Sequence, residues 1–273
     1  MELTGEEKKI QEQAIDYVKE HKGELLDCFV ISKNPLCVDT VSLFMAGSPG
    51  AGKTEFSRRY LPIDIKKYEK QLAVLLGEKN IDIKSIDSYF IKIDVDEIRE
   101  FFPQYQKTDI ENNITGNAHI IQKAAGKGLD IIRKYCFDNH ISFLHDGTFG
   151  NYPTMKKLIK KSLKAGRDVQ IFYLYLDPVA AWNFTKAREY LEGRNIIKEK
   201  FIEQYFDSKE NVDKTKKEFG DEIKVHCVLK NSENNEFEEI KINVPNIEQF
   251  LKTQYNKGTI KRYSKEELSA LIF

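Results

Sequence analysis

A short glycine-rich segment constrains this chain more than any other part of its sequence. Residues 47–54 read GSPGAGKT and fit G-x-x-x-x-G-K-[ST], the pattern of the nucleotide-binding P-loop. The motif consists of Gly47, Ser48, Pro49, Gly50, Ala51, Gly52, Lys53 and Thr54. Residues 41–46 ahead of it are typical of a buried strand, and residues 55–60 behind it are typical of the first turns of a helix. This is the strand–loop–helix context that the motif requires, and it disfavours an accidental glycine-rich turn.

Each part of the motif has a distinct chemical task. The glycines allow the backbone to wrap around phosphate oxygens, so that successive N–H groups and the helix N-terminus face the anion. We expect Lys53 to reach the β- and γ-phosphates of a nucleotide, and the Thr54 hydroxyl to coordinate magnesium. The cofactors that the sequence predicts are therefore ATP and Mg²⁺.

Composition sets broader limits. Lys plus Arg is 43 and Asp plus Glu is 43, so a net charge of zero gives no global argument for binding nucleic acid or an anionic membrane. The four cysteines are scattered without a Cys-x-x-Cys pair, which favours reduced thiols over a disulfide framework or a zinc site. A membrane-spanning apolar stretch is missing, and the polar start is not a signal peptide. We expect a cytoplasmic protein with no membrane partner.

Strand and helix patterns alternate through the middle of the chain. Beyond the P-loop strand, strands are expected at residues 89–93, 141–145, 169–176 and 223–229, and helices at residues 95–102, 117–138, 155–164 and 178–191. Such repetition predicts a parallel sheet with helices on both faces, whose ligands bind beyond the carboxyl ends of the strands. We therefore predict an α/β fold, a three-layer P-loop NTPase sandwich of the kinase type with a mainly parallel five-stranded sheet.

Additional segments flank this predicted core, which we place at residues 39–232. Residues 1–38 form an N-terminal helical extension, with one amphipathic helix expected at residues 4–27. Residues 64–88 read as an insertion into the core. Residues 233–273 form a C-terminal extension with a strand at 237–242 and two helices, the last opened by a capping box of Ser264 and Glu267.

Two aspartates follow the strand expected at residues 89–93. Asp94 and Asp96 stand where that strand ends and a helix begins. A carboxylate at this place can accept a proton from an attacking hydroxyl, as the catalytic aspartate of phosphoryl-transfer enzymes does. The alternative is that either residue merely caps the short helix. The nearby P-loop favours a catalytic carboxylate.

A second acid and two arginines complete the charges that phosphoryl transfer requires. Asp146 follows the strand at residues 141–145 and resembles a Walker-B acid, which holds magnesium directly or through water. Arg188 and Arg194 stand where the helix at residues 178–191 ends. Arginines on a mobile segment over the nucleotide would stabilise the charge that develops during transfer. The alternative is that each is an ordinary surface arginine.

Together these motifs resemble the zeta-toxin family. The resemblance is carried by GSPGAGKT at 47–54, IDVDEIREFFPQY at 93–105, LHDGT at 144–148 and the arginine-bearing helix, and it covers roughly residues 43–194. Members of this family are small-molecule kinases, best known for phosphorylating the 3′-hydroxyl of UDP-N-acetylglucosamine with ATP. Their fold is similar to that of chloramphenicol phosphotransferase.

The resemblance implies roles for particular residues. Lys53 would be the phosphate lysine, Thr54 the magnesium ligand and Asp96 the general base that contacts the substrate hydroxyl. Asp130 stands where the family places a sugar-binding acid, although that acid is usually glutamate, and Thr148 would contact the substrate. Arg188 and Arg194 match the two lid arginines, the second only with a gap. The family's arginine after Gly-Thr is missing, since residues 149–151 read FGN.

Two function classes remain open on the sequence alone. The first is a kinase that acts on a hydroxyl of a nucleotide sugar, with another small metabolite, a nucleotide or an antibiotic as alternative acceptors. The second is an NTPase switch that engages another protein without a hydroxyl acceptor. The resemblance also leaves room for an antitoxin protein as a partner. The charge balance and the lack of interleaved basic and aromatic residues argue against nucleic acid.

Overall fold

The computed structural model describes residues 3–35, 40–59, 90–108, 115–192, 196–234 and 236–273. Its centre is a six-stranded sheet in the order β2-β3-β1-β4-β5-β6. The strands are β1 (Val41–Ala46), β2 (Ile91–Ile93), β3 (Phe143–His145), β4 (Asp168–Tyr175), β5 (Lys224–Lys230) and β6 (Phe237–Lys241). The insertion expected at residues 64–88 and the residue Arg194 lie outside the described residues.

The first five strands are parallel, and β1 lies between β3 and β4. Leu43 of β1 is in register with Leu144 of β3 on one side and with Gln170 of β4 on the other. All five strands therefore end at the same edge of the sheet, which confirms the predicted α/β fold of the kinase type.

The sheet has one strand more than the five expected, because β6 pairs antiparallel with β5. Four of its five residues are exposed, and they include Glu238, Glu239 and Lys241. Charged side chains on an edge strand discourage pairing with another chain, so the C-terminal strand closes the sheet on this side.

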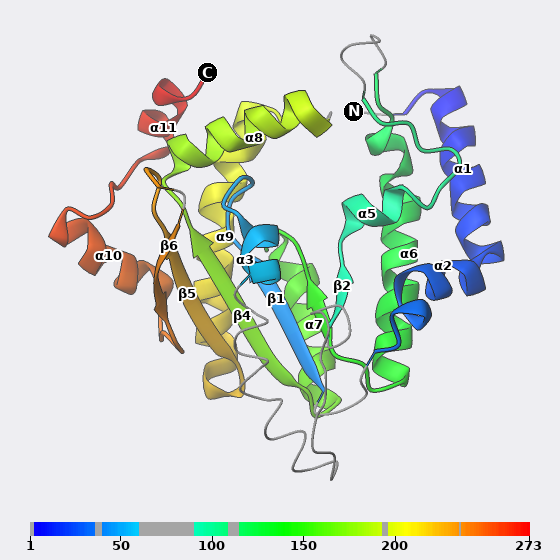
Figure 1. Cartoon of the computed structure of the whole chain (residues 1–273), viewed down its shortest axis with the longest axis horizontal. Helices are drawn as coiled ribbons and strands as arrows, with labels where there is room; N and C mark the ends of the chain where they lie inside the picture. The colour runs from blue at the N-terminus through cyan, green and yellow to red at the C-terminus, as the bar shows by residue number, and fades with distance from the viewer. Residues whose placement is uncertain (1–2, 36–39, 60–89, 109–114, 193–195, 235) are drawn as a thin grey trace.

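Helices cover both faces and both flanks of the sheet (Figure 1). The helices of the core are α3 (Lys53–Arg59), α5 (Val95–Arg99), α6 (Ala118–Asp138), α7 (Tyr152–Lys164), α8 (Pro178–Glu192) and α9 (Lys198–Phe219). In Figure 1, α3 lies in front of the sheet, α7 and α9 lie behind it, and α8 crosses the edge where β4 ends. The terminal helices are α1 (Gly5–Glu20), α2 (Lys22–Phe29), α10 (Ile247–Lys257) and α11 (Lys265–Leu271). None of the described helices is long and apolar enough to cross a membrane.

A buried arginine ties the strands together at the edge opposite their carboxyl ends. Arg167 is 4% exposed, and its guanidinium donates to the Ser42 hydroxyl at 2.7 Å and to the carbonyls of Val41 at 2.9 Å and Ile141 at 2.7 Å. The same group lies over the ring of Phe143. The hydrogen bonds of Arg167 therefore stabilise the edge of the sheet where the strands begin. The candidate site residues lie at the opposite edge, where the strands end.

The N-terminal segment differs from the single helix expected at residues 4–27. It forms two helices, α1 and α2, that meet at His21. The His21 backbone leaves the helical region, and its ring stacks on Tyr17 at 4.0 Å between centroids. Gly23, with its low helix propensity, follows at once. The break lets both helices pack on α6.

Two further helices differ from expectation. The helix expected at residues 95–102 ends at Arg99, after which Phe101 and Phe102 donate to carbonyls three residues back. This tightening precedes Pro103, which disfavours α-helical geometry at the residue before it. The 22-residue helix α9 was not expected at all, although it contacts β1, β4 and β5. The capping box of Ser264 and Glu267 at the start of α11 is confirmed.

Candidate active site

The P-loop follows β1 and leads directly into α3. Gly47, Gly50 and Gly52 have φ values of +131°, +74° and +85°, a region that side chains strongly disfavour. Space is equally limiting, since a Cβ on Gly47 would lie 2.5 Å from the Leu174 carbonyl oxygen and one on Gly50 would lie 2.1 Å from that of Ala181. The loop can therefore curve only because these positions are glycine.

Lys53 opens α3 and turns back over the loop. Its Nζ donates to the carbonyls of Gly47 at 3.1 Å and Ser48 at 2.6 Å. Burial lowers the pKa of Lys53 to about 8, with Asp146 and Asp94 acting to raise it and Arg188 to lower it. The charges of Asp146, Asp94 and Arg188 all affect the pKa of the Lys53 ammonium group. These residues come from α8 and from the ends of β2 and β3, and Lys53 belongs to α3.

Thr54 and Asp146 meet across the site. The Thr54 Oγ1 donates to Asp146 Oδ2 at 3.1 Å, and the Asp146 backbone N–H donates to the Ile93 carbonyl at 3.0 Å. The Asp146 side chain is 8% exposed, and burial raises its pKa, an effect that Lys53 opposes. Both oxygens are hard ligands. Since Mg²⁺ is usually held by one or two protein ligands together with water and substrate phosphates, this pair fits it.

The paired aspartates have separate roles in the structure. Asp94 is the N-cap of α5, because its Oδ1 accepts from the Asp96 backbone N–H at 2.9 Å. Asp96 is not the cap, and its carboxylate accepts instead from the Arg99 guanidinium one turn later. The Asp96 side chain is 32% exposed against 14% for Asp94. Of the two acids, Asp96 is the more accessible to a substrate.

A lysine that no sequence motif singles out joins the acids. Lys92 Nζ lies 2.6 Å from Glu97 Oε1, 3.1 Å from Asp94 Oδ2 and 3.7 Å from Asp146 Oδ2. Burial alone would lower the pKa of Lys92, but these carboxylates together raise it. The signal for this role in the sequence was a lysine inside the apolar run of β2, two residues before Asp94 and four before Asp96.

The loop after β3 approaches the start of the P-loop. The Thr148 carbonyl accepts from the Gly47 N–H at 3.4 Å. The next residue, Phe149, has a φ of +63°, is 3% exposed and packs edge-on against Phe44. At this position, where the resemblance implied an arginine that reaches the substrate, the chain has an aromatic ring buried in the core.

Asp130 lies on α6 with its side chain 77% exposed. It accepts from Arg133 Nη1 at 3.3 Å, and Arg133 Nη2 lies 3.2 Å from His145 Nδ1 at the end of β3. Burial, with help from Arg133, lowers the pKa of His145 to about 3, so the ring stays neutral and can accept this hydrogen bond. Asp130 is thus connected to the end of β3 through Arg133, and its contact with an acceptor stays a prediction.

Helix α8 packs closely over the P-loop. The Thr185 hydroxyl and the Ala181 carbonyl are the atoms that a Cβ on Gly50 would strike, at 2.6 and 2.1 Å. Arg188 follows Thr185 by three residues and so shares its side of the helix. Its effect on the pKa of Lys53 agrees with this position above the phosphate cradle. The second predicted lid residue, Arg194, lies outside the described residues.

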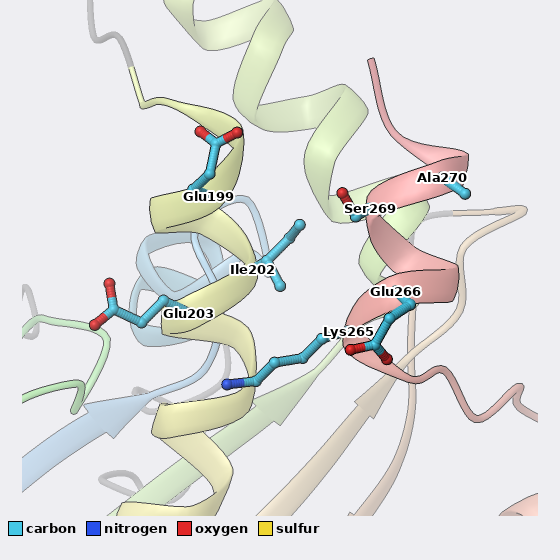
Figure 2. A pocket seen from close by; sticks show the side chains of 7 residues that line it. All are labelled: Glu199, Ile202, Glu203, Lys265, Glu266, Ser269 and Ala270. Carbon is cyan, nitrogen blue, oxygen red and sulfur yellow. The ribbon is translucent and has the colours of Figure 1, made fainter.

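One hollow on the surface is separate from this cluster. It has a volume of about 530 Å³ and lies between α9 and α11 (Figure 2). Ile202 points into it, and Glu199, Glu203, Lys265 and Glu266 surround it. None of the predicted site residues lines it. A smaller hollow of about 130 Å³ adjoins the acids, where Lys92 and Glu97 form part of its wall.

Comparison with known proteins identifies the family. Residues 79–242, more than half of the chain, match the family described as zeta toxin. The chain belongs to the zeta-toxin family of P-loop kinases. The match begins after the P-loop, so the motif at residues 47–54 and the zeta-toxin match are separate observations. Among proteins of curated function, none matches the chain in sequence.

Solved structures with a similar fold include complexes of the AvrRxo1 proteins. The native AvrRxo1-ORF1:ORF2 complex is 11% identical with a TM-score of 0.54, and the complex with ATP is 12% identical with a TM-score of 0.50. Each match covers 89% of this chain and 71% of the other. The PezAT toxin–antitoxin system of Streptococcus pneumoniae is 14% identical with a TM-score of 0.48, covering 100% and 89%. At these identities the AvrRxo1 structures show that this chain shares their fold, and they support no finer conclusion.

Proposed function

We propose that this protein is an ATP-dependent kinase that transfers the γ-phosphate to a hydroxyl of a small molecule, with UDP-N-acetylglucosamine or a similar nucleotide sugar as the acceptor. The observation that carries the proposal is the contact between Thr54 and Asp146 beside the P-loop, with Asp94 linked to the same site through Lys92. Family membership supports the kinase reaction, and the nucleotide sugar rests on the resemblance to the family's best-known acceptor.

The residues divide the reaction between them. Asp96 accepts the proton of the acceptor hydroxyl as its oxygen forms a bond to the γ-phosphorus. The bond between that phosphorus and the β–γ bridging oxygen breaks, and ADP leaves. Lys53 and Arg188 stabilise the negative charge on the phosphate oxygens, and Arg194 would join them. Thr54 and Asp146 would hold Mg²⁺, which when bound neutralises charge on the phosphates.

ATP consumption measured with and without a panel of UDP-sugars tests the proposal. We expect ADP to form in proportion to acceptor, with the phosphate found on a sugar hydroxyl by mass spectrometry and ³¹P NMR. The Lys53→Ala variant should transfer no phosphate. ATP hydrolysis that ignores every acceptor would favour the alternative, an NTPase switch without a hydroxyl acceptor.

One observation favours widening the panel. Phe149 is buried where the family's substrate-contacting arginine would stand, which changes the wall of the acceptor site. Nucleotides, antibiotics and other small metabolites therefore belong beside the UDP-sugars as alternative acceptors. The family's toxin–antitoxin context also supports an antitoxin protein as a partner. Loss of the ATP-dependent activity on adding a candidate antitoxin would test that part.

A further inference from the structure

Helix α9 has two polar side chains that contact the loops on either side of the candidate site. Ser208 and Asn211 are three residues apart, so they lie on the same face of the helix. The fully buried Ser208 Oγ accepts from the Gly47 N–H at 2.7 Å. The Asn211 Nδ2 donates to the carbonyls of Phe149 at 3.1 Å and Gly150 at 3.0 Å. One turn of α9 therefore holds both the first residue of the P-loop and the loop that follows β3.

These contacts satisfy backbone groups that need a partner. The other acceptor near the Gly47 N–H is the Thr148 carbonyl at 3.4 Å, a much longer contact. Buried backbone groups are costly when they are left unpaired, so Ser208 fixes where the P-loop begins. Phe149 has a φ of +63°, which a non-glycine residue keeps only where its surroundings impose it. The hydrogen bonds from Asn211 supply part of that constraint.

We propose that Ser208 and Asn211 are positioning residues that set the separation between the phosphate cradle and the acceptor loop at residues 147–150. The proposal rests on the proposed kinase function, because it assigns the P-loop to the donor and the loop after β3 to the acceptor. Neither side chain touches a reacting atom. They act through the backbone of Gly47 on one side and of Phe149 and Gly150 on the other.

The same helix offers a matched control. Thr215 is also fully buried, and its hydroxyl donates to the Asn211 backbone carbonyl at 2.7 Å. This bond stays within α9, so the Thr215→Val variant removes a buried hydroxyl without releasing either loop. A variant that only weakens the helix should behave like Thr215→Val.

The test compares Ser208→Ala, Asn211→Ala and Asn211→Asp with Thr215→Val in the full chain. Ser208→Ala should weaken the binding of a non-hydrolysable ATP analogue by about tenfold, the upper end for one lost hydrogen bond. Asn211→Ala should raise KM for the acceptor and lower kcat while leaving binding of the analogue near wild type. Asn211→Asp should be worse than Asn211→Ala, because it places a carboxylate of equal size against two carbonyl oxygens. Ser208→Cys keeps the volume with a weaker acceptor and should give an intermediate loss.

Hydrogen exchange provides a readout that does not depend on activity. Replacing Ser208 should speed exchange at residues 47–52, and replacing Asn211 should speed it at residues 147–151, relative to Thr215→Val. The positioning role is wrong if both loops exchange in the Ser208 and Asn211 variants as they do in Thr215→Val, and if Ser208→Ala and Asn211→Ala do not differ in their effects on analogue binding and on acceptor kinetics. If the wild type consumes no ATP with any acceptor, the kinase proposal fails, and the exchange data still decide whether α9 positions the two loops.

Discussion

The Thr54 hydroxyl donates to Asp146 at 3.1 Å and so joins the first turn of α3 to the end of β3. Thr54 belongs to the P-loop, and Asp146, 92 positions later in the chain, directly follows β3. Lys92 Nζ lies 3.7 Å from the same Asp146 oxygen. The Lys92 ammonium group therefore already faces the Asp146 carboxylate. We expect Mg²⁺ to bind to Asp146 with this ammonium group close by.

Asp146→Asn should raise the Mg²⁺ concentration that gives half-maximal activity by roughly 10- to 100-fold, the range for disturbing a metal's supporting groups. The amide keeps the size of the side chain but loses its charge. Mn²⁺ binding followed by electron paramagnetic resonance in the presence of an ATP analogue should weaken in parallel. Asp138→Asn is the matched control, because that exposed acid on α6 forms an ion pair with Lys134 one turn earlier in the same helix. An unchanged Mg²⁺ requirement in Asp146→Asn would remove this residue from the metal site.

Lys53 should give nucleotide binding a pH dependence. Its pKa of about 8 lies below the ordinary value of a lysine, so its charge is present below that pH and is lost as pH rises through it. Affinity for a non-hydrolysable ATP analogue should therefore fall between about pH 7 and pH 9. Lys53→Ala should bind weakly with no inflection in that range. Calorimetric titration at several pH values measures both, and an inflection that persists in the variant would point to another group.

Replacing each of the two neighbouring aspartates should have a different effect on kcat. Asp96→Asn should lower kcat by roughly 10²- to 10⁴-fold, the usual loss of a general base, with binding of an ATP analogue nearly unchanged. Asp94→Asn should do much less, because asparagine is as good an N-cap and keeps the bond to the Asp96 N–H. Steady-state kinetics with saturating acceptor measure the difference. If the large loss follows Asp94 instead, the general base has been assigned two residues too late.

Much of the site follows from the sequence because parallel strands end at one edge. Asp94 and Asp146 come directly after two strands, and Asp96 follows two residues after Asp94, so a parallel sheet gathers them beside the P-loop at the carboxyl ends of its strands. Their gathering at this edge needs only strand direction and the local motif. It does not depend on the pairing of β6 with β5 or on the break at His21.

The remaining contacts could not be found in this way. Ser208 meets Gly47 across 161 residues, and nothing in the charged sequence of α9 distinguishes it from other small polar residues. Lys92 looks like the polar half of a strand alternation, and its role appears only when three carboxylates surround it. The placement of these side chains depends on tertiary packing, which motif spacing does not contain.

His145 should make the protein less stable in acid. Its pKa is about 3 in the folded chain and near 6.5 when unfolded, so protons bind the unfolded state first as pH falls below 6.5. At pH 5 this difference amounts to about 2 kcal/mol of lost stability. His145→Gln keeps an acceptor for Arg133 but does not titrate. Urea unfolding at pH 7 and pH 5 should show a smaller drop in the variant by about that amount, and equal drops would contradict the assignment.

The N-terminal helices should be structural. Ala14, Val18 and Leu25 are fully buried, and a Cβ on Gly128 of α6 would lie 3.5 Å from Val18 and 3.6 Å from Leu25. In Figure 1, α1 and α2 lie on the far side of α6 from α3 and the P-loop. This position favours ordinary packing over a helix that blocks the nucleotide site in cis.

Deleting residues 1–27 should therefore destabilise or aggregate the protein, because the deletion exposes the apolar face of α6. The milder change Leu25→Ala should lower the free energy of unfolding by about 2–5 kcal/mol. Leu271→Ala on α11, where the leucine is 50% exposed, should change it by no more than about 0.5 kcal/mol. Thermal melting and ATP consumption, measured on the truncated and full-length proteins, distinguish a structural role of α1 and α2 from an inhibitory one. A truncated protein that stays folded and turns over faster than the full chain would establish that α1 and α2 inhibit it.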